Sequence, residues 1–241
     1  DEIIFTLKKN AMKNLHAMVL GATGATGQEI VRLLLKDDAY SKVSIFVRSK
    51  PNIQHNKLMV HEVDFSKLNN YKDLINGDIL FSALGTTRKE AGSLKQQYLV
   101  DYTYQYEFAQ MASDNGVTHY SLVSSTGANE KSFFFYPKVK GSLEESVKKL
   151  KFKKIQIFQP PMLIRQAELM REPEKNGIKF LKGLNKIGLL KSQKPLSVSL
   201  LESLLGLIFG FLGSFFNRAN SAFRVSISDC CFKIISCCCS I

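Results

Sequence analysis

The feature that most restricts the fold of this chain is the heptapeptide Gly-Ala-Thr-Gly-Ala-Thr-Gly at residues 21–27. It follows a buried-strand pattern at residues 15–20 and opens an amphipathic helical pattern at residues 28–35. Glycine permits a tight turn and leaves backbone N–H groups accessible, and the positive end of the helix dipole then faces any ligand. This strand–turn–helix unit predicts a pyrophosphate site of the kind that binds dinucleotides. A glycine-rich turn without a ligand is the alternative.

Apolar runs of strand length alternate with helix-length stretches over the following residues. Strands are expected at residues 15–20, 43–47, 58–63, 78–84, 119–124 and 155–158, and helices at 28–35, 94–115 and 136–149. Such alternation predicts βαβ units with right-handed crossovers and a parallel sheet. We therefore expect an α/β, Rossmann-type doubly wound fold over residues 12–200. Its small C-terminal substrate-covering region, about residues 162–200, would contain a helix near 174–190.

The end of the second expected strand indicates which dinucleotide binds. NAD-specific folds place an acidic residue about 20 residues beyond the glycines, where it holds the ribose 2′-hydroxyl. Residues 43–50, Val-Ser-Ile-Phe-Val-Arg-Ser-Lys, contain no acidic residue, and Arg48 stands in that place. A guanidinium suits a 2′-phosphate through charge-assisted hydrogen bonds. We therefore predict NADP(H) as the cofactor, the alternative being a solvent-exposed arginine at a strand end.

Further cofactor contacts are expected where other strands end. Asp64 and Phe65 follow the third strand and offer a carboxylate for the adenine amine and a ring to pack on the base. Leu84 and Gly85 follow the fourth strand, in a run of small residues that lets the cofactor approach the backbone. In the glycine turn and the first helical turn, the predicted contacts are Gly21, Thr23, Gly24, Ala25, Thr26 and Gly27.

Tyr136 and Lys140 are candidate catalytic residues. Their spacing places a phenol and an ammonium on one helix face, one turn apart. The ammonium stabilises the phenolate, so Tyr136 is suited to exchange a proton with a substrate carbonyl or alcohol, while Lys140 also hydrogen-bonds the nicotinamide ribose. Ser125, at the end of the fifth strand, is expected to orient the substrate oxygen. The alternative is an amphipathic helix whose tyrosine and lysine only pack against its surface.

Seven segments occur in order: GATGATG, the arginine that closes the second strand, SALGTTRKEAGS, VDY, LVSSTGAN, YPKVKG and IFQPPMLIR. Together they resemble the short-chain dehydrogenase/reductase superfamily over roughly residues 14–200. The resemblance is strongest to its atypical branch, which includes the Tat-interacting-protein oxidoreductases and NmrA-like NAD(P)H-binding proteins. It implies an NADP(H)-binding Rossmann domain with Ser125, Tyr136 and Lys140 as catalytic candidates. It also implies that Pro160 lies at the cofactor and that the backbone after Pro160 and Pro161 reaches the nicotinamide carboxamide.

Two residues depart from that family's pattern. Many short-chain reductases carry an asparagine of a proton relay on the long helix, and the matching stretch here offers Asp101. Pro161 stands where the family has the glycine of Arg-Pro-Gly, and it removes a backbone N–H beside the nicotinamide. The first departure bears on proton transfer and the second on the loop geometry.

Two functions follow from these residues. The first is an NADP(H)-dependent oxidoreductase that acts on a small carbonyl or alcohol substrate, and the alternative is a non-catalytic NADP(H)-sensing regulatory protein. The formal net charge of +12 favours anionic partners in general. We expect a small-molecule substrate and no nucleic acid, with a protein partner or a homodimer as further options. The four histidines are scattered and the cysteines form no metal-ligand spacing, so no metal site is expected.

Residues 201–241 depart from the pattern of the preceding chain. Residues 203–216 form a charge-free run that is shorter than the about 20 residues of a membrane span, and all five cysteines follow it. Three interpretations remain open: a buried or interface helix, a membrane-surface anchor helped by acylated cysteines, and a tail that is not a native continuation. Residues 1–11 lack the pattern of a secretory signal, so a cytoplasmic location is expected by default.

Overall fold

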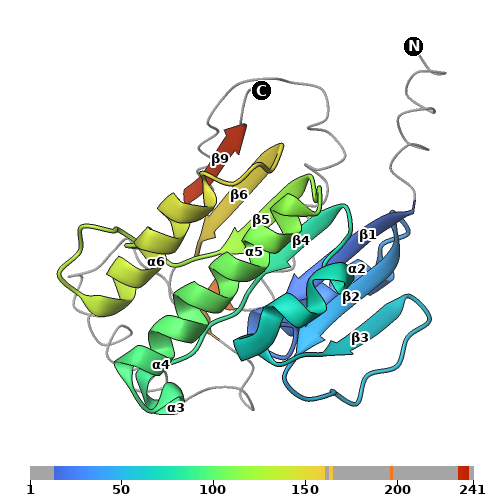
Figure 1. The fold of residues 1–241 in the computed structure, drawn as a ribbon, viewed down its shortest axis with the longest axis horizontal. Coiled ribbons are helices and arrows are strands. Elements are labelled where there is room, and N and C mark those ends of the chain that lie inside the picture. The colour runs from blue at the N-terminus through green and yellow to red at the C-terminus, as the bar shows by residue number, and fades with distance from the viewer. Residues whose placement is uncertain (1–13, 161–162, 165–195, 198–232, 239–241) are drawn as a thin grey trace.

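The computed structural model describes residues 14–160, 163–164, 196–197 and 233–238, and a single seven-stranded sheet forms its centre (Figure 1). The strand order is β3-β2-β1-β4-β5-β6-β9. The strands are β1 (Leu15–Leu20), β2 (Tyr40–Val47), β3 (Leu58–Glu62), β4 (Ile79–Ser82), β5 (His119–Val123), β6 (Lys154–Gln159) and β9 (Lys233–Cys238). Strands β1 to β6 pair in parallel, which confirms the Rossmann-type doubly wound fold.

The helices connect the parallel strands. They are α2 (Ala25–Lys36), the 3₁₀ segment η1 (Phe65–Leu74), α3 (Arg88–Ala91), α4 (Leu94–Tyr98), the π-helical segment η2 (Leu99–Thr103), α5 (Tyr104–Asp114) and α6 (Phe135–Val147). The helix expected at residues 94–115 is present, but it consists of three consecutive segments, because the π-helical turn η2 lies between α4 and α5. The Ser93 side chain caps its start by accepting a hydrogen bond from the Gln96 amide. Gly116, with φ of 85°, follows its end.

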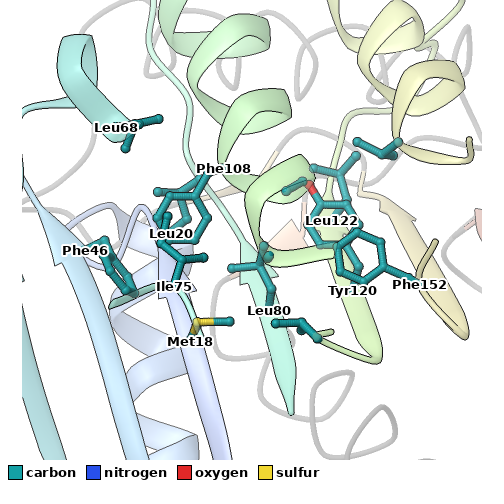
Figure 2. Packing of buried hydrophobic residues seen from close by; sticks show 14 of the residues in the cluster. Met18, Leu20, Phe46, Leu68, Ile75, Leu80, Phe108, Tyr120, Leu122 and Phe152 are labelled. Atoms are coloured by element: carbon teal, nitrogen blue, oxygen red, sulfur yellow. The ribbon is translucent and has the colours of Figure 1, made fainter. Parts of the chain in front are cut away.

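Alternate residues of each strand face opposite layers of helix. On β1, Ala17 and Val19 belong to the apolar cluster that contains the buried face of α2, whereas Met18 and Leu20 belong to the cluster under α5 and α6. Figure 2 shows the second cluster, in which Phe108 lies close to Leu20 and Phe46. Helices therefore cover both faces of the sheet, as the near-continuous apolar strands require.

The sheet brings the ends of three strands together. β1 is central, and its last residue Leu20 pairs with Phe46 of β2 on one side and with Ser82 of β4 on the other. The chain leaves β2 toward β3 and leaves β4 toward β5, so the strand order reverses at β1. Open α/β sheets bind ligands outside the carboxyl ends of the strands at such a reversal.

The C-terminal segment contributes one further strand. The backbone of β9 pairs antiparallel with β6, with Lys154 opposite Cys238 and Gln159 opposite Lys233 (Figure 1). Short strands β7 (Leu163–Ile164) and β8 (Leu196–Ser197) form a second sheet. The expected helix at 174–190 and the apolar run at 203–216 lie outside the described residues. Within the described part of the chain, no helix combines the length and the apolar character needed to cross a membrane.

Candidate functional site

The turn after β1 depends on glycine at two positions. Gly21 has φ of 82°, and a Cβ there would lie 2.6 Å from the carbonyl carbon of Ala83 in the neighbouring strand connection. A Cβ on Gly27 would collide with the carbonyl oxygen of Gly21, which also accepts a hydrogen bond from the Gly24 amide at 3.0 Å. The turn is therefore tight, as the sequence pattern predicts, and it also packs against the end of β4.

The first turn of α2 presents its backbone N–H groups at this site. Gly24 is the N-cap residue, its backbone is extended, and no side chain caps the helix. The first N–H groups of a helix have no partner within the helix and carry the positive end of its dipole. Thr23 and Gly24 are exposed and offer no bulky side chain over these groups. The geometry thus fits an anionic group such as a pyrophosphate.

A cleft of about 920 Å³ opens beside this turn. Its lining comes from the ends of β2 and β3, from the segments after β1, β2, β3 and β4, and from α3, α4 and the π-helical and α-helical parts of the long helix, including Val100 and Tyr104. Of the predicted cofactor residues, its lining includes Gly21, Thr23, Gly24, Arg48, Asp64, Phe65, Leu84 and Gly85. Ala25, Thr26, Gly27, Lys140 and Pro160 are outside the lining. Arg48, directly after β2, and the glycine turn after β1 therefore line the same cavity.

The residues after β3 have local roles that were not predicted from the sequence. Asp64 caps η1, because its Oδ1 accepts hydrogen bonds from the Ser66 hydroxyl at 2.6 Å and the Ser66 amide at 2.9 Å. These hydrogen bonds lower the pKa of Asp64. Phe65 is buried, with its ring centroid 5.7 Å from that of Tyr104. That Asp64 and Phe65 contact an adenine base remains a prediction.

The candidate catalytic pair lies on α6, but its members have different surroundings. Tyr136 is 38% exposed near the start of the helix, whereas Lys140 is 2% exposed. Burial lowers the pKa of the Lys140 ammonium, while Asp101 and Glu144 act in the opposite direction. The Lys140 Nζ lies 3.9 Å from Asp101 Oδ1. Neither Tyr136 nor Lys140 is among the residues that line the cleft.

Two adjacent serines follow β5 and have different hydrogen-bond partners. Ser124 is buried and donates a hydrogen bond to Glu144, whose carboxylate also accepts from the Gln159 amide at 2.9 Å. Ser125 is half-buried and donates to the Thr126 carbonyl at 3.3 Å. Ser124 is therefore part of a buried polar network, and Ser125 remains the hydroxyl predicted to meet a substrate.

The loop after β5 is fixed against α6. The Asn129 amide donates to the Pro137 carbonyl at 2.9 Å. A Cβ on Gly141 would collide with the backbone of Asn129 and Glu130. The close approach of these backbones therefore sets the position of the helix that carries Tyr136 relative to the loop that begins at Ser125. On the other side, the Thr126 amide donates to the Pro160 carbonyl at 3.1 Å.

The long helix contributes Asp101 through its π-helical turn. Asp101 is fully buried in η2, and its Oδ1 accepts a hydrogen bond from the Thr86 amide at 3.0 Å. The sequence singled out Asp101 only as a departure from the family's asparagine and missed Glu144 altogether. The i,i+4 spacing of Lys140 and Glu144 on a buried helix face was the available signal. Pro161, the other departure, lies outside the described residues.

Comparisons with known proteins place the chain in a family. Residues 21–155 match the family described as NAD(P)H-binding. The chain belongs to this family. It is 35% identical over 177 residues to Protein HTATIP2 of Rattus norvegicus, covering 72% of this chain and 73% of that protein. It is 34% identical over 205 residues to Protein FMP52-1, mitochondrial, of Scheffersomyces stipitis, covering 83% and 81%. The resemblance to the atypical short-chain dehydrogenase/reductase branch is thereby confirmed.

Solved structures support the fold. The chain is similar to Bordetella bronchiseptica WbmH, solved in complex with NAD+, with a TM-score of 0.56 and 15% identity. That likeness covers 70% of this chain and 62% of WbmH. WbmG of the same organism, solved with NAD, gives a TM-score of 0.57 at 12% identity and covers 81% and 68%. At these identities the likeness shows a shared Rossmann-type fold.

The expectation of a cytoplasmic location is wrong on this comparison. The FMP52 relatives from Scheffersomyces stipitis, Aspergillus fumigatus and Candida albicans are all named mitochondrial proteins. The expectation rested only on the lack of a secretory signal pattern at residues 1–11. That lack carries no information about proteins that other targeting sequences direct to an organelle.

Proposed function

We propose that this protein is an NADP(H)-dependent oxidoreductase that acts on a small carbonyl or alcohol. The observation that carries the proposal is the shared cavity of the glycine turn and Arg48. Bare amides at one end suit a pyrophosphate, and a guanidinium at the end of β2 suits a 2′-phosphate. No acidic residue stands at the end of β2, where an NAD-specific site needs a carboxylate.

The residues on α6 would supply the proton chemistry. When bound, the cofactor supplies or accepts the hydride. Tyr136 is exposed near the start of α6, where its phenol is accessible to a substrate oxygen. Lys140, one helical turn further on, favours the phenolate through its positive charge. Ser125 belongs to the loop that the Asn129–Pro137 hydrogen bond ties to this helix, and its hydroxyl is suited to orient the substrate oxygen.

Titration of NADPH and NADH into wild type and Arg48→Glu tests the cofactor assignment. The substitution replaces a charge-assisted hydrogen bond by repulsion, so the NADPH dissociation constant should rise about 30-fold or more. NADH lacks the 2′-phosphate, and its binding should change by less than about threefold. Lys50→Glu is the matched control, because it makes the same change of charge two residues away. Equal losses in the two variants, or equal losses for the two dinucleotides, would refute the 2′-phosphate site.

Turnover is tested separately from binding. A panel of small carbonyl compounds with NADPH should show oxidation of NADPH by the wild-type protein. NADPH binding without turnover across the panel would favour the alternative, an NADP(H)-sensing module that signals to a protein partner. A protein that binds neither dinucleotide would overturn both functions.

A further inference from the structure

A buried charge cluster lies between the long helix and α6. It consists of the Lys140 ammonium and the carboxylates of Asp101 and Glu144, three groups that are each at most 3% exposed. Buried charges persist in proteins only when they are paired and hydrogen-bonded. Glu144 is satisfied by Ser124 and Gln159, which tie it to the ends of β5 and β6. Asp101 has a different set of contacts.

The Asp101 carboxylate contacts two functional elements with one oxygen. Its Oδ1 accepts the Thr86 amide at 3.0 Å and lies 3.9 Å from the Lys140 ammonium. Thr86 and the adjacent Gly85 line the cleft, and a Cβ on Gly85 would lie 3.4 Å from the same oxygen. The carboxylate is therefore in direct contact with the cleft loop on one side and with the candidate catalytic lysine on the other.

The backbone around Asp101 holds this carboxylate in place. Asp101 lies in η2, where the π-helical turn adds a residue to the helix. The Gln105 side chain donates to the Asp101 carbonyl at 2.9 Å and accepts from the Ser82 hydroxyl at 2.9 Å. Ser82 is the last residue of β4, directly before the cleft loop. The π-helical turn, the loop and the strand end are therefore connected by buried hydrogen bonds. Such a connected network is expected to hold one geometry.

We propose that Asp101 is a positioning residue that couples the Gly85–Thr86 loop of the cleft to the charge and position of the Lys140 ammonium. The inference rests on the proposed function, because the loop and the lysine matter together only if a dinucleotide spans them. An asparagine at this position would keep a hydrogen-bond acceptor for the Thr86 amide but would lose the charge that faces the lysine. The carboxylate therefore has two separable roles: it accepts the hydrogen bond of the Thr86 amide, and it places a negative charge beside the Lys140 ammonium.

Two substitutions separate these roles. Asp101→Asn removes the charge and retains an acceptor, and Asp101→Ala removes both. Glu144→Gln is the matched control, because it neutralises the other carboxylate that faces Lys140 and leaves the Thr86 contact intact. Among the described residues, Asp101 from η2 and Glu144 from α6 itself are the charged groups that act on this ammonium. Titration of protein labelled with [ε-¹³C]lysine follows Lys140, whose signal is the one absent from Lys140→Arg.

The expected results differ between the variants. Asp101→Asn should lower the titration midpoint of Lys140 by about one pH unit or more, because an opposite charge within about 4 Å is lost. Amide hydrogen exchange at Thr86 should accelerate about tenfold or more in Asp101→Ala and stay near the wild-type rate in Glu144→Gln. NADPH affinity of Asp101→Asn should begin to weaken at a lower pH than that of wild type. A Lys140 midpoint that does not move in Asp101→Asn, or a Thr86 amide that exchanges at the wild-type rate in Asp101→Ala, would overturn the proposal.

Failure of this proposal is distinguishable from failure of the proposed function. If wild type binds no dinucleotide, the function is refuted, and the proposed coupling to a cofactor falls with it even where the NMR midpoint shifts as expected. If NADPH binds but its pH profile is the same in wild type and Asp101→Asn, only the coupling is refuted. Should Asp101→Asn fail to fold, the double variant Asp101→Asn/Lys140→Met provides the readout. It should regain a cooperative urea unfolding transition, because the buried lysine charge is removed together with its partner, and a double variant that also fails to fold would overturn the pairing.

Discussion

Alanine substitutions at Gly24 and Gly27 should separate an effect on ligand binding from an effect on stability. An alanine Cβ at Gly24 would lie 3.4 Å from the Gly21 carbonyl oxygen, an ordinary contact, and the Gly24 φ and ψ of −77° and 162° suit any residue. The loss of a good N-cap residue costs about 0.5–1 kcal/mol and the stiffer unfolded chain returns about 0.4–1 kcal/mol. We therefore expect the unfolding free energy of Gly24→Ala to stay within about 1 kcal/mol of wild type, a change in Tm of about 4 °C or less.

Gly27→Ala should have the opposite profile. Its Cβ would collide with the Gly21 carbonyl oxygen, so backbone must shift. Such overpacking costs about 1–3 kcal/mol, and helix propensity returns at most about 1 kcal/mol. A net loss of about 2 kcal/mol corresponds to a fall in Tm of about 4–8 °C for a domain of this size. Gly24→Ala, by contrast, places its methyl group where the cleft needs bare backbone, and loss of one charge-assisted hydrogen bond weakens NADPH binding about tenfold or more.

Differential scanning calorimetry and NADPH fluorescence titration measure the two quantities on the same samples. The reasoning requires Gly24→Ala to be stable and weak in binding. If Gly24→Ala bound NADPH as wild type does, the phosphates would not lie on this turn, whatever its shape. If Gly27→Ala melted at the wild-type temperature, the close packing of the turn would not contribute to stability.

Three further predictions concern ionisable and polar groups. Burial, and to a smaller extent the charge of Lys42, lowers the pKa of His16 from 6.5 to about 4. Between these two values the unfolded chain binds a proton that the folded protein does not, so the unfolding free energy falls as the pH drops from 6.5 toward 4. With an allowance for the partial exposure of His16, the unfolding free energy measured in urea should fall by about 1 kcal/mol more between pH 7 and pH 5 in wild type than in His16→Gln. Equal falls in the two proteins would show that His16 is not the source of this pH dependence. Tyr136→Phe should lower turnover about 100-fold or more with NADPH affinity retained, and undiminished turnover would remove Tyr136 from the mechanism. Ser125→Ala should lower turnover about tenfold, whereas an effect on NADPH binding alone would reassign Ser125 to the cofactor site.

Local chemistry explains why the fold could be predicted from the sequence. Residues 15–47 already contain a buried strand, a turn that needs glycine at Gly21 and Gly27, a helix and a second strand, and these elements form as expected. The chain also fixes Arg48 beside the turn, because parallel strands β1 and β2 end at the same edge of the sheet. Short-range patterns are sufficient where each element follows its own periodicity.

The parts that were missed depend on contacts between distant residues. Nothing in the periodicity of residues 94–115 shows the added residue of η2, although it directs Asp101 toward Lys140. The cap that Asp64 provides for η1 is a local feature that was not predicted, although the Asp-x-Ser spacing with Ser66 offered it, and the adenine contact at Asp64 stays a prediction. The pairing of β9 with β6 joins chain segments far apart in sequence, and no local pattern specifies it.

The missing side chain of Gly141 has a consequence for how the molecule moves. Because the helix backbone rests on that of Asn129 and Glu130, α6 cannot slide or roll past the preceding loop without a steric collision. The start of α6, which carries Tyr136, and the loop at Asn129 and Glu130 should therefore move together. A motion that displaced α6 alone would have to break the hydrogen bond between the Asn129 amide and the Pro137 carbonyl.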